Sequence, residues 1–571
     1  MAAALGRVVR LPTSLFEAVP LILKLLQLEE PRSILDVGVG FGKYGVLARE
    51  ALEIPLDRYG RAQWQVQIEG VEAFPAYRTP IHDYIYDRVY YADIRNIVSD
   101  LPVYDVILLI DVLEHFEKDQ GHTILRELLK RTRKSLIVST PLYPAVQGAY
   151  LGNPHEAHLS RWSLLDFVEF DFTHHFVETG ANGAQVFRIF PHNSPVGGDF
   201  PENDLSAPLQ ADETPLTVGY VLPHNRLTGG LKMLLEQVKH LQRRGHRVRA
   251  FRRDRLGQKV LPEWSDVKPD ETILVPEGRR YCDYVAGCDV VVTGWMTDAT
   301  ELSYAPMPVM YWEQGNEWLF GEMGDERTAL EIRRRLVQCY SQPFYLAAVS
   351  PLVSRILYAR YGRRAPVIPN GVDTSFYEPG PPARGDEILL VGNPALKFKG
   401  FDVALRTLQR VWDAGYRFRV TWVCQAPTRV SGVSFPIELV VNPSQEGLPQ
   451  IYRRAGVFLF TSWYEGFGMP PLEAMAAGVP VVTTLCGGVS AYVKPGYNAL
   501  AADPGDVDSL ASAVMYLLQD ESARQMLGQR GRETALRYAA PHVVVRLESL
   551  LRAMVSRHEE RFRAGYSVRH C

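Results

Sequence analysis

The sequence is poor in cysteine, and its cysteines are not spaced for a metal site or a disulfide framework. Six cysteines occur among 571 residues, and no two of them form a CxxC pair. We expect them to be buried or incidental thiols of a protein in a reducing cytoplasm. Disulfide-stapled and cysteine-ligated zinc folds are therefore excluded.

Long apolar runs are also absent. No stretch of about 18 apolar residues exists, so no segment is expected to span a membrane. Glu17, Pro20 and Lys24 interrupt the apolar residues near the N-terminus and no small-residue cleavage site follows, so we expect no signal peptide. These absences predict a cytoplasmic protein.

Neither charge nor repetition distinguishes the chain. Its 62 basic and 65 acidic residues nearly balance, so no bulk contact with nucleic acid is expected. There is no repeat of about 20–50 residues and no low-complexity tract, which excludes solenoid folds. The length is that of about three or four domains, each able to bury its own core.

The most informative stretch is 462–483, which reads SWYEGFGMPPLEAMAAGVPVVT. Seven residues separate Glu465 from Glu473, and Gly466 and Gly468 follow the first acid. The pattern predicts a glycine-rich loop, a helix and then a strand. Such a loop presents unpaired backbone N–H groups and the positive end of the helix dipole, which suits a diphosphate.

We expect the helix of this stretch to begin at Leu472, after Pro470 and Pro471 close the loop. Glu473 would then lie in the first helical turn, where its carboxylate can reach a ribose diol. Glu465, on the loop, can accept hydrogen bonds from sugar hydroxyls. Taken alone, two acids at this spacing would indicate an ordinary strand–loop–helix connection.

This stretch resembles the donor-binding motif of family-4 glycosyltransferases, which are retaining enzymes of the GT-B fold. Three further segments occur in the order that this family shows: LTGGLKMLLEQVKHLQRRGHRV (227–248), VIPNGVDTSFY (367–377) and VGNPALKFKG (391–400). The resemblance covers about residues 214–540. It implies a nucleotide-diphosphate sugar as donor substrate and a glycan or lipid-linked glycan as acceptor, without specifying the sugar.

The resemblance also implies roles for single residues. Glu465 and Lys399 would be catalytic, with Lys397 as a second cation, although Lys397 is also interpretable as a solvated surface residue. Relatives usually carry Arg where this chain has Asn393, so one of two cations at the leaving diphosphate is missing. The implied donor-binding residues are Gly229, Gly230, Asn393, Lys399, Glu465, Gly466, Phe467, Gly468 and Glu473.

The acceptor side departs from the family pattern. Many relatives carry a histidine where residues 307–321 have Glu313, Gln314 and Glu317. Glu313 and Glu317 are therefore our acceptor-side candidates in this half. The pattern is similar to rhamnosyltransferase-like members of the family, which is only a hint about the sugar.

The first half predicts a series of strands and helices. A helix is expected over residues 15–28, and residues 33–50 then indicate a strand, a glycine turn and a second helix. Further strands are expected to end at Glu72, at residues 92–94 and with the continuous apolar run 104–110. Acidic residues stand at these strand ends.

This series looks like a class I S-adenosylmethionine-dependent methyltransferase, over roughly residues 15–191. The resemblance implies S-adenosyl-L-methionine as cofactor and Asp111 as the catalytic residue beside its methyl group. The cofactor-binding residues it implies are Asp36, Gly38, Gly40 and Gly42 near the methionine, Glu72 on the ribose, and Asp93 and Ile94 at the adenine.

After a fifth strand at residues 136–141, NPHEAHLSRWSLLDF (153–167) looks like the segment that closes the substrate pocket in small-molecule methyltransferases. His155 and His158 are therefore further acceptor-side candidates. We expect Trp162 and Phe167 to be core residues instead.

One set of residue types in this half would also suit a divalent ion. Asp111, Glu114 and His115, with His155 or His158, offer oxygen and nitrogen ligands. A Glu-His pair more often simply ends a strand, so we expect that no metal is required.

An Asp-x-Asp sequence, Asp506 and Asp508, is typical of metal-dependent sugar transferases of the other major fold. These acids follow Pro504 and Gly505 and precede a helical pattern. They are better interpreted as acids at a helix N-terminus, so we reject the metal interpretation.

The expected fold class is α/β, with three Rossmann-like doubly wound domains. Linker composition separates the two halves, because Pro, Gly, Asn, Asp and Ser dominate it. The expected parts are a methyltransferase domain (1–190), the linker (191–215), an acceptor-side glycosyltransferase domain (216–377), a donor domain (378–545) and a C-terminal helix or tail (546–571).

The C-terminal tail carries a small positive charge. From residue 552 onward, five arginines stand against Glu559 and Glu560, an excess of +3. This charge would allow contact with an anionic bilayer at the inner face of the membrane, where a lipid-linked acceptor would be found. A solvated terminal helix is the commoner meaning of such a segment.

Together these features predict a bifunctional enzyme of bacterial surface polysaccharide or glycoconjugate assembly. It would combine retaining glycosyl transfer with S-adenosylmethionine-dependent methylation. Two alternatives stay open: an enzyme that glycosylates and methylates a natural product, and a glycosyltransferase whose first half is a non-catalytic binding module. The acids at positions 36, 72 and 93 argue against the second alternative.

Overall fold

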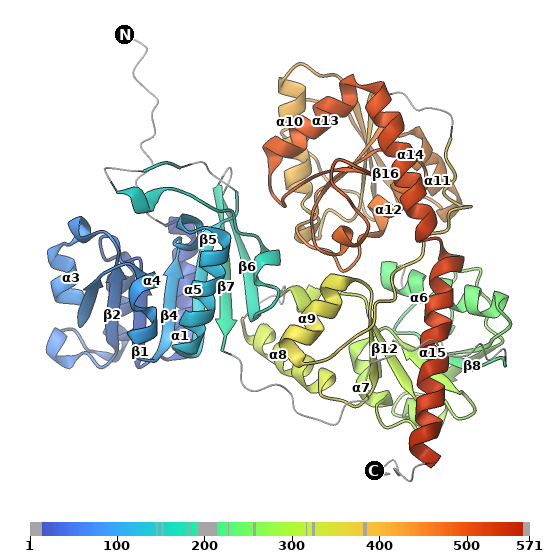
Figure 1. The fold of residues 1–571 in the computed structure, drawn as a ribbon, viewed down its shortest axis with the longest axis horizontal. Coiled ribbons are helices and arrows are strands. Elements are labelled where there is room, and N and C mark those ends of the chain that lie inside the picture. The colour runs from blue at the N-terminus through green and yellow to red at the C-terminus, as the bar shows by residue number, and fades with distance from the viewer. Residues whose placement is uncertain are drawn as a thin grey trace. The chain divides into compact units, whose positions relative to one another are not determined.

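In the computed structural model, which describes most of the chain, the protein forms two compact units. The units are residues 1–194 with 320–330, and residues 195–319 with 331–571. Three sheets with helices beside them carry the described residues, so the expected α/β class is confirmed (Figure 1). The structure describes residues 14–143, 147–149, 153–179, 182–191, 214–225, 228–254, 259–315, 317–321, 326–380 and 385–563.

The first unit contains a seven-stranded sheet with the order β3-β2-β1-β4-β5-β7-β6. Its strands are β1 (Ser33–Val37), β2 (Gln67–Glu72), β3 (Arg88–Tyr91), β4 (Tyr104–Ile110), β5 (Thr132–Pro141), β6 (Asp171–Thr179) and β7 (Asn182–Phe190). Its helices are α1 (Val19–Glu29), α2 (Lys43–Leu52), α3 (Pro80–Ile85), α4 (Ile94–Ile97) and α5 (Lys118–Lys130).

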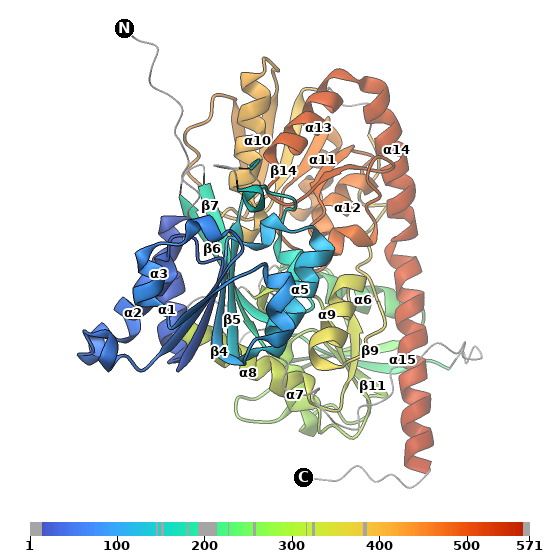
Figure 2. The same ribbon diagram turned by 60° about the vertical axis from the view of Figure 1, so that its left-hand side comes forward.

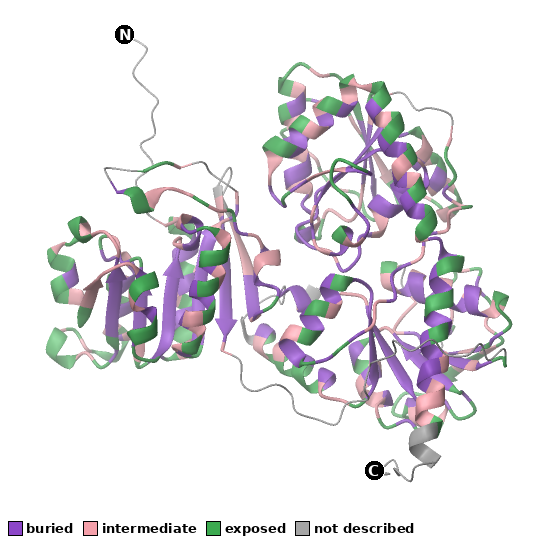
Figure 3. Ribbon diagram, in the orientation of Figure 1, coloured by how far each residue is buried: buried purple, intermediate pink, exposed green. Residues whose placement is uncertain are grey.

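Strands β1 to β5 are parallel, and every residue of β4 is buried, as its apolar sequence predicts. In Figure 2, α1 and α5 lie on opposite sides of β4 and β5, and Figure 3 shows the strands of this sheet as largely buried. The sequence analysis missed the last two strands, which pair antiparallel with each other while β7 pairs antiparallel with β5.

The second unit contains two six-stranded parallel sheets, each at the centre of a lobe. The first lobe has the order β10-β9-β8-β11-β12-β13. Its strands are β8 (Thr217–Val221), β9 (Arg247–Arg253), β10 (Glu271–Val275), β11 (Val290–Thr293), β12 (Val309–Glu313) and β13 (Tyr345–Ala348). Its helices are α6 (Gly229–Arg243), α7 (Met296–Leu302), α9 (Pro351–Tyr361) and α8 (Glu326–Tyr340), of which residues 326–330 are grouped with the first unit.

The second lobe repeats this plan with the order β16-β15-β14-β17-β18-β19. Its strands are β14 (Glu387–Val391), β15 (Arg419–Cys424), β16 (Ile437–Val441), β17 (Val457–Phe460), β18 (Val481–Thr484) and β19 (Leu500–Ala502). Its helices are α10 (Phe401–Asp413), α11 (Leu448–Arg454), α12 (Met469–Ala476), α13 (Val507–Gln519) and α14 (Glu521–Arg537).

Each sheet reverses its strand order beside its own first strand. The neighbours at the reversal are β1 and β4 in the first unit, and β8 and β11 or β14 and β17 in the two lobes. The loops after two such strands leave the sheet in opposite directions, which opens a crevice at the carboxyl edge. Ligand sites are therefore expected at these three reversals.

The C-terminal helix α15 (Ala540–Arg563) packs against α6 of the first lobe. Its Glu548 forms an ion pair with Arg244 and lies 3.1 Å from Nε2 of His246, and Arg552 donates to the carbonyl of Thr214 at 2.8 Å. Arg552 therefore joins the helix to the rest of the second unit, and contact of the tail with a bilayer stays a prediction. No helix among the described residues is long and apolar enough to cross a membrane.

Several local expectations are confirmed. Trp162 and Phe167 are buried, and Asp506 accepts a hydrogen bond from the N–H of Ser509 at the start of α13. The five described cysteines are free, and four of them are buried. Residues 192–213 of the expected linker, the side chains of Arg561 and Arg563, and Arg569 lie outside the residues that the structure describes.

Tyr86 connects α2 to β1 in the core of the first unit. Its hydroxyl accepts a hydrogen bond from the N–H of Gly45 at 3.0 Å and donates one to Asp36 at 2.6 Å. A Cβ at Gly45 would overlap the Tyr86 ring. The absence of a side chain at Gly45 thus lets the ring reach Asp36.

Gly45→Ala should therefore destabilise the protein, because overpacking and two broken hydrogen bonds outweigh the gain of about 1 kcal/mol from alanine in a helix. We expect a net loss of about 2 kcal/mol, measured by scanning calorimetry. Gly60→Ala is the matched control, since Gly60 has φ −105° and its nearest neighbouring atom would lie 3.6 Å from a Cβ. Equal stability of the two variants would contradict this packing.

Candidate active sites

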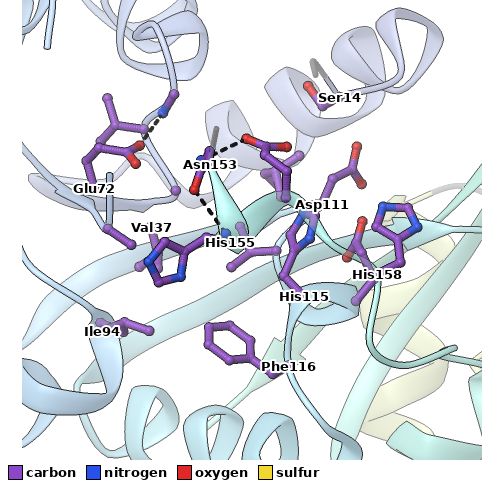
Figure 4. Close-up of a pocket in the computed structure, with 18 of the residues that line it drawn as sticks. Ser14, Val37, Glu72, Ile94, Asp111, His115, Phe116, Asn153, His155 and His158 are labelled. Atoms are coloured by element: carbon purple, nitrogen blue, oxygen red, sulfur yellow. Dashed lines mark hydrogen bonds between the residues drawn. The ribbon is translucent and has the colours of Figure 1, made fainter. Parts of the chain in front are cut away.

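The first site is a cavity of about 700 Å³ at the carboxyl edge of the first unit's sheet (Figure 4). It lies at the reversal between β1 and β4, and segment 153–159 also lines it. Its volume is in the range of cofactor and small-ligand pockets. Of the residues predicted from the sequence, Gly38, Gly40, Glu72, Asp93, Ile94, Asp111, His155 and His158 line it.

The loop after β1 depends on glycine. Gly38 and Gly40 have φ values of 83° and 56°, a left-handed conformation that glycine adopts without strain. Glu72 at the end of β2 holds this loop, because it accepts hydrogen bonds from the N–H groups of Gly40 and Phe74, both at 2.8 Å. Burial raises the pKa of Glu72. Glu72 thus positions the loop as well as lining the cavity.

Two of the expected cofactor residues lie elsewhere. Asp36 is buried against Tyr86, outside the cavity lining, and burial raises its pKa to about 7. Gly42 also lies outside the lining and is the N-cap residue of α2. Asp36 therefore supports the core instead of contacting a ligand directly, whereas the ligand contact of Gly42 stays a prediction.

Asp93 lines the cavity, but its carboxylate already interacts with Arg95. It accepts a hydrogen bond from the N–H of Arg95 at 2.9 Å and forms an ion pair with that guanidinium at 2.6 Å. The hydrogen bonds from Arg95 lower the pKa of Asp93. A ligand amino group would have to share this carboxylate with Arg95.

Asp111 occupies the start of the loop after β4 with φ 53°, which is unusual for a residue with a side chain. The Ser139 hydroxyl donates to its carboxylate, and its own N–H donates to the Ser139 carbonyl at 3.0 Å. Burial raises the pKa of Asp111. A strained acidic residue at a cavity is a frequent mark of a functional site.

Glu114, His115 and His158 come together at one part of this cavity. One potential ligand atom from each lies within 4.8 Å of the others, and the two imidazole rings are 5.1 Å apart. Figure 4 shows His115 and His158 on the opposite side of the cavity from Glu72. Of the two histidine candidates that the sequence offered, His158 joins this cluster, whereas His155 is exposed.

The second site lies at the carboxyl edge of the second lobe, where the loops after β14 and β17 meet. The ammonium of Lys399 is 2.7 Å from a carboxylate oxygen of Glu465, and the Ser462 hydroxyl donates to the same oxygen at 2.8 Å. Two segments that are far apart in the sequence therefore bring their predicted catalytic residues into contact.

Backbone segments meet at this site without side chains between them. A Cβ at Gly466 would overlap the carbonyl oxygen of Gln314, and one at Gly315 would lie 2.5 Å from the Cα of Gly466. Gln314 also donates to the carbonyl of Gly230 at 3.2 Å, and Gly230 and Gly229 begin α6. The glycine loops of both lobes are thus joined through residues 314 and 315.

The helix after this loop begins earlier than expected. Helix α12 starts at Met469, because Pro470 and Pro471 fit the first helical turn, where a missing N–H costs nothing. Glu473 therefore lies in the second turn, which corrects its expected position. It is buried and accepts a hydrogen bond from the Tyr452 hydroxyl at 2.9 Å.

The sequence analysis missed Lys232. This residue is in the first turn of α6, and its ammonium lies 3.5 Å from Glu473 of the other lobe. The only sequence signal was a basic residue two positions after the glycines that begin the helix. Lys232 supplies a cation at the predicted donor site that the family resemblance does not indicate.

Three other donor-site predictions have different surroundings from those expected. The Phe467 ring is buried between Tyr492 and Tyr538, so a donor contact of this residue would have to come from its backbone. The Tyr492 hydroxyl also donates to the carbonyl of Gly468. Asn393 accepts a hydrogen bond from the N–H of Ala395 at 3.0 Å, and Lys397 is exposed.

Glu313 is a structural carboxylate, and its expected contact with an acceptor is corrected. It is 1% exposed and accepts hydrogen bonds from the hydroxyls of Tyr311 at 2.5 Å and Tyr340 at 2.6 Å, and from the N–H of Gly315 at 2.8 Å. It thereby fixes the start of the 314–315 segment. The side chain of Glu317 lies outside the described residues.

The second lobe carries a known sequence family. Residues 437–534, from β16 into α14, match the family described as glycosyl transferases group 1. Glu465 and Glu473 both lie within the matched residues, whereas Lys399 and Lys232 contact them from outside the match.

Each of two curated relatives matches only a part of the chain, and the longer match covers about a third of it. O-antigen chain mannosyltransferase B of Escherichia coli is 42% identical over 95 residues, which is 16% of this chain and 24% of the relative. MMP alpha-(1->4)-mannosyltransferase of Mycolicibacterium hassiacum is 28% identical over 217 residues, 36% of this chain and 52% of the relative. The chain thus spans about a quarter to a half of these relatives' lengths.

A solved structure shares its fold with about three fifths of the chain. Sucrose-phosphate synthase from Thermosynechococcus elongatus aligns over its whole length with 60% of this chain, at a TM-score of 0.51 and 18% identity. At this identity the likeness concerns the fold alone. It confirms the expected GT-B fold, whereas the methyltransferase fold of the first unit stays a prediction.

Glu313→Gln should destabilise the second unit, because the amide NH₂ would face one of three donors and leave it unpaired. A loss of about 1.5–3 kcal/mol is expected, as for hydrogen bonds to charged groups. Denaturant unfolding measures it against Glu331→Gln, a control whose side chain is 61% exposed. A Glu313→Gln protein as stable as this control would show that the carboxylate does not hold the segment.

Proposed function

We propose that the second unit is a retaining glycosyltransferase that uses a nucleotide-diphosphate sugar. The observation that carries the proposal is the contact between Lys399 and Glu465 at the reversal of the second lobe's sheet. A cation and a hydrogen-bonding carboxylate held together by glycine loops suit a diphosphate joined to a sugar. The glycosyl transferases group 1 domain and its mannosyltransferase relatives support the same chemistry.

Each charged residue has a distinct task in this proposal. Lys399 would neutralise the charge that develops on the diphosphate as the glycosidic bond breaks. When the donor occupies the site, Glu465 would exchange the Lys399 ammonium for sugar hydroxyls. Glu473, held by Tyr452 and paired with Lys232, would bind the ribose. The acceptor would be a glycan or a lipid-linked glycan.

For the first unit we propose S-adenosyl-L-methionine-dependent methyl transfer. The residues fit this cofactor, because the cavity lies at the strand reversal and Glu72 and the glycine loop form one wall. The bound cofactor would supply a methyl group on a positively charged sulfur. Asp111 would face that charge, and Glu72 would accept hydrogen bonds from the ribose.

The two alternatives from the sequence differ in testable ways. A natural-product enzyme would use the same two sites with a different acceptor, so acceptor screening separates it from polysaccharide assembly. The O-antigen relative favours assembly of a bacterial surface glycan in the cytoplasm. A non-catalytic first unit would bind no S-adenosylmethionine. The intact positions of Glu72 and Asp111 at the cavity favour the enzyme.

Glu72→Ala should weaken S-adenosylmethionine binding by roughly 1–3 kcal/mol, the scale of lost charged hydrogen bonds. The loss combines the ribose contact with a looser Gly40 loop. Calorimetric titration of the full chain measures it. Glu127→Ala is the control, because Glu127 lies on α5 and pairs with Lys130. Unchanged affinity of Glu72→Ala would refute the ribose assignment.

The variants Glu465→Ala and Glu473→Ala should have different kinetic defects. Loss of Glu473 should chiefly raise KM for the donor, because this residue is assigned to the nucleotide. Loss of Glu465 should chiefly lower kcat, because the sugar changes charge and shape in the transition state. Steady-state kinetics with the preferred nucleotide sugar distinguish the two, and identical defects would mean that the roles are wrongly divided.

The missing cation at Asn393 should be supplied by other lysines. Lys399→Ala should abolish most sugar transfer. Lys232→Ala should cause an intermediate loss, and Lys397→Ala a smaller but measurable one, since Lys232 is held 3.5 Å from Glu473 and Lys397 is exposed. Asn393→Arg should be tolerated or raise the rate.

These variants are compared by kcat/KM for the donor. A Lys397→Ala enzyme with unaltered kcat/KM would show that Lys397 is a solvated surface residue. Unaltered kcat/KM in both Lys397→Ala and Lys232→Ala would contradict compensation altogether.

A further inference from the structure

We propose that Glu114, His115 and His158 bind a divalent transition-metal ion in the cavity of the first unit. Glu114 and His115 belong to the turn Leu113–His115 after β4, and His158 to the segment that closes the cavity. One ligand atom from each residue lies within 4.8 Å of the others. Small side-chain rotations would bring the three atoms to a shared ion.

The strongest support comes from Glu114. This side chain is 3% exposed, and its Oε2 atom has no hydrogen-bond partner among the described residues. A buried carboxylate oxygen without a partner costs folding free energy, and native proteins rarely leave one. An ion at this position would supply the missing partner.

His115 is oriented as metal-binding histidines usually are. Its Nδ1 atom lies 3.1 Å from the carbonyl oxygen of Ala157. With the proton on Nδ1 donated to that carbonyl, Nε2 carries the lone pair that a metal ion requires. The Ala157 carbonyl comes from the same segment as His158, so the segment that brings one ligand also orients the other.

The ligand types indicate the class of ion. Two imidazole nitrogens and one carboxylate oxygen favour Mn²⁺, Fe²⁺, Co²⁺ or Zn²⁺, whereas Mg²⁺ and Ca²⁺ prefer oxygen alone. Three protein ligands leave coordination positions for a small molecule. All three residues line the cavity, so a hydroxyl-bearing ligand there could occupy those positions. Asp111 opens the same loop and would add negative charge near the ion.

This proposal departs from the expectation that the first unit needs no metal. It does not depend on the proposed methyl transfer, because the three ligands and the unpartnered oxygen are features of the folded chain. Metal binding and S-adenosylmethionine binding can therefore be measured separately, and either can fail without the other.

The test is direct binding of metal to the full chain after chelator treatment and dialysis. Titration with Mn²⁺, Co²⁺, Zn²⁺ and Mg²⁺ should show one tight site per chain for at least one transition metal and at least about tenfold weaker binding of Mg²⁺. Bound Co²⁺ should show a visible spectrum typical of imidazole ligation. No tight site for any of the three transition metals would overturn the proposal.

Matched variants locate the ion. His158→Ala and Glu114→Gln should each weaken binding at least about tenfold, whereas His155→Ala should bind as the parent does, since His155 is exposed on the same segment. Circular dichroism of each variant establishes that it is folded. Parent-like affinity in folded His158→Ala would place the ion elsewhere and overturn the assignment.

Discussion

Parallel strands all end at the same edge of their sheet, and this constraint determines where ligands can bind in this chain. In each of the three sheets the order reverses beside the first strand, so the loops after β1 and β4, β8 and β11, and β14 and β17 diverge. The glycine loop at 38–42, the glycines at 229–230, and Lys399 with Glu465 all follow one of these strands. One topological feature, used three times, therefore positions the cavity of the first unit and the charged residues of the second.

Acidic residues near these edges accept hydrogen bonds from the protein itself, apart from any contact with a ligand. The Glu72 carboxylate accepts a hydrogen bond from the N–H of Gly40. The Glu313 carboxylate accepts one from the N–H of Gly315 and two more from tyrosine hydroxyls. Glu473 accepts from a buried tyrosine. Such contacts fix loops in conformations that leave room for a ligand, as required where an interaction must be preorganised. Substitutions of these acids therefore need a stability measurement beside each binding or kinetic measurement.

The sequence predicts strands β1 to β5 and the glycine loops, because these depend on local patterns, and the family resemblance assigns Lys399 and Glu465 to one donor site. It does not predict which way Asp36 faces, since Tyr86 lies 50 residues further along the chain. Lys232 was missed for the same reason, because its partner belongs to another lobe. The β6–β7 pair was missed because the sequence analysis made no prediction for residues 171–190. Local patterns place residues along the chain, whereas their partners come from the tertiary fold.

The central claim is that one chain carries two separate small-molecule sites. The most direct measurement is calorimetric titration of the full chain with S-adenosylhomocysteine and, in the same sample, with nucleoside diphosphates. The account predicts one molecule of each class per chain, with the affinity for either unchanged when the other is bound. Competition between the two ligands, or no binding of S-adenosylhomocysteine at any concentration that saturates comparable cofactor sites, would contradict it.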